Sequence, residues 1–125
     1  MLITASILGF LGVMLGAFAA HGLKAVLTEA QITSFQTGVR YQFYHTFLLL
    51  AVANTSLVAD VFKKRIYWLL LIGVIFFSGS IYILSLDEYI LGSNIKGIAM
   101  FTPLGGLLLL GAWLLLFMGV IKKRN

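Results

Sequence analysis

The amino-acid sequence predicts an all-α integral membrane protein, a four-helix bundle with a short amphipathic helix in its first extracytoplasmic loop. Of the 125 residues, 61% are hydrophobic and only 10% are charged, whereas soluble domains carry about 25% charged residues. Four stretches are each long and apolar enough to cross a hydrocarbon core, which takes roughly 20 helical residues. Because they use nearly the whole chain, we expect one transmembrane domain over residues 1–125.

The four expected spans cover residues 2–20, 41–59, 66–86 and 98–121. Small residues follow one face of the first span at spacings of three and four: Ala5, Gly9, Gly12, Gly16 and Ala19 or Ala20. Such faces bring membrane helices close together, so we expect this one to pack against a neighbouring helix. No Lys or Arg precedes the apolar run, which favours a retained helix over a signal peptide.

The first loop, residues 21–40, is too long for a simple turn. Thr28 and Gln31 have the spacing of a capping box, which starts a helix. Three apolar residues then recur at helical spacing: Ile32, Phe35 and Val39. We expect an amphipathic helix on the outer surface that bends or runs into the second span. A connector that caps the bundle is the preferred interpretation, and a lid over a cavity is the alternative.

The basic residues predict the orientation. One side of a four-span protein would hold both termini and the middle loop, and it would carry six of the nine cations: Lys63, Lys64, Arg65, Lys122, Lys123 and Arg124. The other side would carry Lys24, Arg40 and Lys96. The excess predicts a multi-pass protein of the cell (inner) membrane with cytoplasmic termini. Since the clusters adjoin apolar runs, they indicate topology or anionic lipid headgroups rather than nucleic acid.

The third and fourth spans carry the remaining unusual residues. Ser78 and Ser80 fall in the outer half of the third span, and Asp87 or Glu88 beyond it can pair with Arg40. The single proline, Pro103, lies in the predicted fourth span. There we expect it to kink the helix and free the carbonyl of Ala99.

Polar residues of all four spans are expected at similar depth in the outer half of the bilayer. The candidate ligand-binding residues are His21, Arg40, Tyr41, Tyr44, His45, Ser80 and Thr102. An ionisable residue inside a span is a functional hypothesis by default. His45 can also hydrogen-bond Ser80, Thr102 or the freed carbonyl, and such a purely structural cluster is the preferred interpretation.

Four segments, residues 16–24, 35–46, 76–84 and 102–106, resemble motifs of the YgdD/YwdK family. Those motifs read Gly-Ala-Phe-Gly-Ala-His-Gly-Leu, Tyr-Gln-x-Tyr-His, Phe-Ser-Gly-Ser-x-Tyr and Thr-Pro-x-Gly-Gly. The members of this family are small, uncharacterised bacterial inner-membrane proteins with four predicted spans. The resemblance implies this fold and this location, and it implies no chemical reaction. The signature residues of the family coincide with the polar cluster described above.

The function predicted from sequence is therefore a non-enzymatic membrane protein whose polar cluster holds a lipid headgroup or a small polar ligand. One alternative is a small transporter or channel subunit gated near His45 and Pro103. The other is a haem or metal protein using His21 and His45. No catalytic residues, cofactor, metal or nucleic acid are predicted. Membrane lipids are the expected partners, and the many glycines and large apolar surface are compatible with a homo-oligomer.

Overall fold

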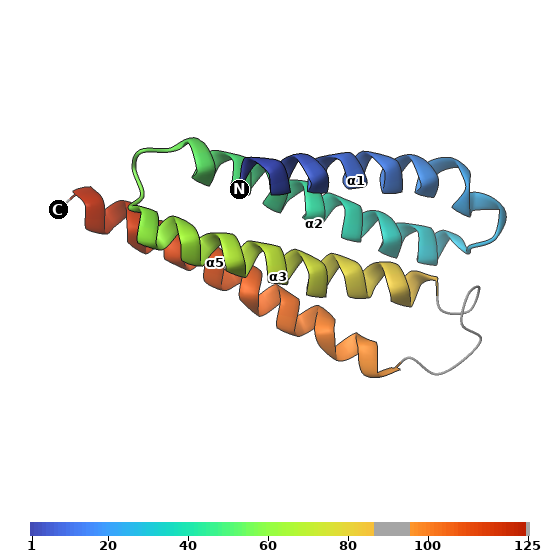
Figure 1. The fold of residues 1–125 in the computed structure, drawn as a ribbon. Helices are drawn as coiled ribbons and strands as arrows, with labels where there is room; N and C mark the ends of the chain where they lie inside the picture. Colours follow the sequence, from blue (N-terminus) through green and yellow to red (C-terminus); the bar gives the residue numbers. More distant parts are fainter. Residues whose placement is uncertain (87–95, 125) are drawn as a thin grey trace.

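The computed structural model describes residues 1–86 and 96–124. This part of the chain contains four long helices and two short 3₁₀ helices. The long helices are α1 (Leu2–His21), α2 (Glu29–Asn54), α3 (Asp60–Ser85) and α5 (Phe101–Arg124), and the short ones are η1 (Leu23–Ala25) and η2 (Lys96–Met100). Consecutive long helices run antiparallel, and both termini lie toward the end that holds the α2–α3 connection (Figure 1). The all-α bundle predicted from sequence is confirmed.

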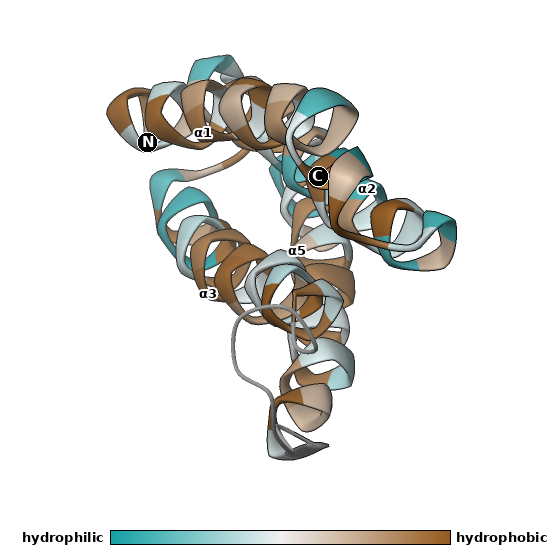
Figure 2. Cartoon of the chain, turned by 90° about the vertical axis from the view of Figure 1, so that its right-hand side faces the viewer, coloured by the Kyte–Doolittle hydropathy of each residue, from teal (hydrophilic) through white to brown (hydrophobic). Residues whose placement is uncertain are grey.

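Within the described residues, three segments are long and apolar enough to cross a membrane: Leu2–Ala25, Asp60–Ser85 and Gly97–Lys123. Large apolar side chains of these helices point outward, among them Phe10, Ile75 and Leu110. Hydrophobic residues accordingly dominate the visible ribbon of α1, α3 and α5 (Figure 2). An apolar exterior of this kind suits a protein whose solvent is lipid.

Helix α2 takes one of the two forms expected for the first loop. The amphipathic helix runs into the second span, and together they form one continuous helix that begins at Glu29. Thr28 and Gln31 form the predicted capping box. The helix ends at Asn54, because Thr55 adopts an extended conformation and turns the chain toward α3.

The small-residue face of α1 packs against α2, as predicted. Ala5 and Ala19 are fully buried. A Cβ atom on Gly12 would lie 2.9 Å from the ring of Phe43, so this glycine lets the two helices approach closely.

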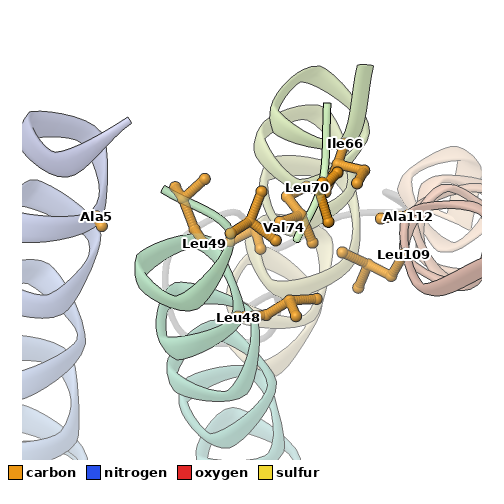
Figure 3. Close-up of a cluster of buried hydrophobic side chains, with 10 residues drawn as sticks. Ala5, Leu48, Leu49, Ile66, Leu70, Val74, Leu109 and Ala112 are labelled. Carbon is orange, nitrogen blue, oxygen red and sulfur yellow. The ribbon is translucent and has the colours of Figure 1, made fainter. Parts of the chain in front are cut away.

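Helices α3 and α5 form the closest helix pair. A Cβ atom on Gly73 would lie 2.7 Å from the side chain of Leu109. Between the helices lies an apolar core to which α2, α3 and α5 contribute leucine, isoleucine and valine side chains (Figure 3). Its members include Leu49, Leu70 and Leu109.

Pro103 lies near the beginning of the candidate span Gly97–Lys123, just after the change from η2 to α5. Helix α5 begins at Phe101, so Pro103 lies in its first turn. The first four N–H groups of a helix have no intrahelical acceptor, so a proline there costs no hydrogen bond. The carbonyl of Ala99 belongs to η2, directly before the helix, and the expected kink at Pro103 stays a prediction.

Replacing Thr28 with alanine is expected to fray the first turn of α2. The Thr28 hydroxyl accepts from the backbone N–H of Gln31 at 3.3 Å, and the Gln31 side chain accepts from the backbone N–H of Thr28 at 2.9 Å. Loss of an N-cap of this kind costs about 1 kcal/mol. Hydrogen exchange should accelerate at residues 29–32 and stay unchanged near Leu49. Unaltered exchange at the first turn would contradict this role of Thr28.

Candidate functional site

A groove of about 690 Å³ lies between α2 and α5, with α3 behind it. Helix α2 contributes Tyr41, Tyr44 and His45, and α3 contributes Phe77. The α5 wall consists of Pro103, Gly106, Leu107, Leu109, Leu110 and Trp113. No charged residue is among these groups, so the groove is apolar except for two phenols and one imidazole.

The α2 wall of the groove is a cluster of rings centred on Tyr41. Its ring centroid lies 4.7 Å from Phe77, 5.8 Å from Tyr44 and 6.1 Å from His45. Tyr41 and Tyr44 are 40% and 56% exposed. Among the described residues, neither phenol hydroxyl has a hydrogen-bond partner.

His45 is 5% exposed and makes one hydrogen bond within the described residues. Its Nδ1 lies 2.7 Å from the Tyr41 carbonyl, and a carbonyl only accepts, so Nδ1 carries the proton. In the neutral ring, Nε2 is then an acceptor. The expected bonds to Ser80, Thr102 or the Ala99 carbonyl do not form, because the imidazole folds back onto its own helix.

The groove lies along the body of α2 rather than at its first turn. At about 1.5 Å per residue, His45 is about 24 Å along α2 from Glu29 and about 14 Å from Asn54. His45 and its neighbouring phenols therefore lie in the body of α2, well away from both of its ends. The expected depth of His45 in the outer half of the bilayer stays a prediction.

Ser80 and Thr102 meet beside the groove, toward the end of the bundle opposite the α2–α3 connection. Their hydroxyl oxygens lie 2.7 Å apart, and Ser80 also donates to the Phe77 carbonyl at 3.0 Å. Thr102 also lines a separate cavity of about 340 Å³ near the N-terminus of α2. This pair therefore joins α3 to α5, and the groove lining does not include it.

His21 and Arg40 are exposed and do not join the other candidates. His21 forms one hydrogen bond among the described residues, with its Nδ1 atom 3.2 Å from the Ala17 carbonyl. Arg40 donates to the Thr37 hydroxyl at 2.9 Å, and its expected acidic partners Asp87 and Glu88 lie outside the described residues.

The two histidines lie far apart along the bundle. The α1–α2 register pairs Leu8 with Gln42 and Gly16 with Val39, which puts His21 level with the first turns of α2. His21 is thus about 15–20 Å along the axis from His45. Both imidazoles cannot ligate one metal ion at that separation, since metal–nitrogen bonds are about 2 Å long.

Gln42 is the important polar residue that sequence reasoning missed. It is 4% exposed. Its amide nitrogen donates to the Leu8 carbonyl at 2.7 Å, and its amide oxygen accepts from the Tyr82 hydroxyl at 2.8 Å. One side chain thus links α1, α2 and α3. The signal was available, because Gln42 falls at helical spacing between the buried residues Val39 and Thr46.

Several uncharged polar side chains toward the α2–α3 connection form hydrogen bonds within the protein. Thr46 donates to the Gln42 carbonyl at 2.7 Å, and the hydroxyls of Thr4 and Tyr67 lie 3.1 Å apart. Asn54 marks the end of α2, and Thr55 and Ser56 follow it in the connection. These residues form no polar path through one protomer, which argues against the channel alternative.

Comparisons with known proteins agree with the membrane fold. The family model "Protein of unknown function (DUF423)" matches residues 15–106. A UPF0382 membrane protein of Haemophilus influenzae is 40% identical over 94% of this chain and 90% of its own length. The UPF0382 inner membrane protein YgdD of Escherichia coli K12 is 39% identical over 100% of this chain and 92% of its own. No solved structure matches the chain significantly.

Proposed function

This chain belongs to the DUF423 family of membrane proteins of unknown function, and we propose that it binds an uncharged lipid or lipid-soluble molecule in the groove between α2 and α5. One observation carries the proposal. Two phenol hydroxyls and the Nε2 atom of a histidine line an otherwise apolar groove along the body of α2, and the described residues offer them no partner.

The energetic argument rests on the absence of water in the hydrocarbon core. A hydroxyl transferred there without a hydrogen bond costs several kcal/mol. Tyr41 and Tyr44 each present one donor, and His45 presents one acceptor. A ligand that pairs with these groups would recover that cost, whereas hydrocarbon chains alone would not.

The same groups restrict the chemistry of the ligand. The groove lining contains no Lys, Arg, Asp or Glu, so a charged headgroup would lie unpaired in low dielectric. A hydroxyl or carbonyl group suits the phenols and the imidazole. The α5 wall, with Leu107, Leu110 and Trp113, suits a hydrocarbon tail or a ring.

Binding without catalysis is the simpler role for this site. Reaction chemistry needs a nucleophile or a matched acid–base pair. The groove offers one imidazole whose Nδ1 is already committed to the Tyr41 carbonyl. We further propose that the six clustered cations place both termini in the cytoplasm, so that the groove's Trp113 end lies toward the inner leaflet.

Filling the groove should abolish ligand retention. A Cβ atom on Gly106 would have ordinary contacts, 3.7 Å from the Phe77 ring, so Gly106→Leu should fold and occupy the groove. Native mass spectrometry of protein released gently from its own membrane should show a bound neutral molecule on the wild type. We expect at least a tenfold loss of that species from Gly106→Leu.

The matched control is Gly79→Leu on α3, where a new Cβ meets nothing within 4 Å. It adds the same side chain outside the groove and should retain the ligand. Equal retention by both variants would refute the groove as the site. A wild-type dimer without any added mass would show instead that a second copy covers the phenols.

A further inference from the structure

A second groove, of about 550 Å³, lies at the opposite end of the bundle, between the start of α3 and the end of α5. Its residues are Ala59, Val61, Phe62, Gly119, Lys122 and Lys123. Four of the six are apolar or lack a side chain, and two are cationic. The groove is thus apolar inside and positively charged toward the end of the helices.

The lysines are held beside the groove by the packing of α5. Lys123 donates from Nζ to the Ser56 carbonyl in the α2–α3 connection. One turn earlier, a Cβ atom on Gly119 would lie 3.2 Å from Val58 and 3.3 Å from Phe62. The missing side chain therefore lets the end of α5 lie against the connection and the start of α3.

The local charge is strongly positive. Lys63, Lys64 and Arg65 follow the groove residues on α3. Asp60 is the one acidic side chain among the described residues of this end. Near a membrane surface each such cation attracts anionic headgroups.

We propose that this groove binds an anionic phospholipid, with its phosphate against Lys122 and Lys123 and one acyl chain along Val61 and Phe62. An anionic phospholipid matches the layout of the groove. Its phosphate would lie against the lysines, and its hydrocarbon chain would lie against the apolar residues. If these cations served only to set the orientation of the protein in the membrane, no apolar groove would be needed beside Lys122 and Lys123. The site is distinct from the uncharged groove at His45 and does not rest on it.

The test uses the full-length protein in mixed micelles, with phosphatidylglycerol as the probe and phosphatidylcholine of the same acyl chains as reference. Native mass spectrometry counts the lipids retained. We expect the wild type to retain phosphatidylglycerol preferentially. Lys122→Gln/Lys123→Gln should weaken that retention about 30-fold, the effect of two near-surface cations.

Lys63→Gln/Lys64→Gln is the matched control, because it removes the same charge at the same end from residues that do not line the groove. It should keep most of the retention. Equal losses in both double variants would overturn the site in favour of general attraction to a basic surface. So would equal retention of the two lipids by the wild type.

A second variant tests the apolar part of the groove. Val61 is 63% exposed, so Val61→Trp should fold and fill the groove while every cation remains. Loss of the preference for phosphatidylglycerol would support an acyl chain in the groove. A wild-type preference in this variant would overturn that placement.

Discussion

Replacing Gly105 with alanine is expected to force α3 and α5 apart and to lower the free energy of unfolding by about 3 kcal/mol. A Cβ atom at this position would collide with the backbone nitrogen of Phe77. It would also lie 2.8 Å from the Cα atom of Phe77 and 2.9 Å from the Gly73 carbonyl. Backbone atoms in a packed helix cannot rotate away as a side chain does, so the helices themselves must move. Unfolding in mixed detergent, followed by circular dichroism, measures the loss.

The neighbouring glycine supplies the control. Gly106→Ala adds the same methyl group with its nearest contact at 3.7 Å, and it should be neutral or slightly stabilising, since alanine favours helix. Comparable losses for the two substitutions would show that α3 and α5 are not packed as closely as Gly105 requires.

Replacing Gln42 with leucine is expected to cost about 2 kcal/mol. The change conserves much of the volume but removes the bonds to the Leu8 carbonyl and the Tyr82 hydroxyl. Interhelical hydrogen bonds in membranes contribute roughly 0.6 kcal/mol each on average, and the hydroxyl left unpaired adds to the loss. The same detergent unfolding assay applies.

A double-mutant cycle separates the two bonds of Gln42. Tyr82→Phe in the Gln42→Leu background should cost less than it does in the wild type, because the hydroxyl has already lost its acceptor. Gln36→Leu, at an exposed position of the same helix, should change stability little. Additive losses from Gln42→Leu and Tyr82→Phe would contradict their coupling.

Composition and periodicity were sufficient to predict the bundle. Apolar runs near 20 residues predict membrane helices because the bilayer sets that length. The capping box at Thr28 and the small-residue face through Gly12 were predictable because each depends on local spacing. The sequence could not decide whether the amphipathic first half of α2 bends away or continues straight into the second span, because that half resembles a surface helix.

The candidate site was predicted only in part, because hydrogen bonds between helices depend on their register. Tyr41, Tyr44 and His45 share a groove, and Ser80 meets Thr102. The sequence placed His21 and Arg40 near His45 only because all three were expected at a similar depth in the bilayer. The register of α1 against α2 puts His21 level with the first turns of α2, which separates it from His45.

The succession of contacts, α1 with α2, α2 with α3 and α3 with α5, has a consequence for biogenesis. As the ribosome delivers the chain, each new helix finds its main partner already synthesised. Among the long helices that the structure describes, α2 alone is not apolar enough by composition to be a candidate membrane span. Helix α1 emerges first and presents the Leu8 carbonyl that Gln42 needs. We therefore expect α2 to leave the translocon together with α1, as a hairpin, rather than to partition into lipid alone.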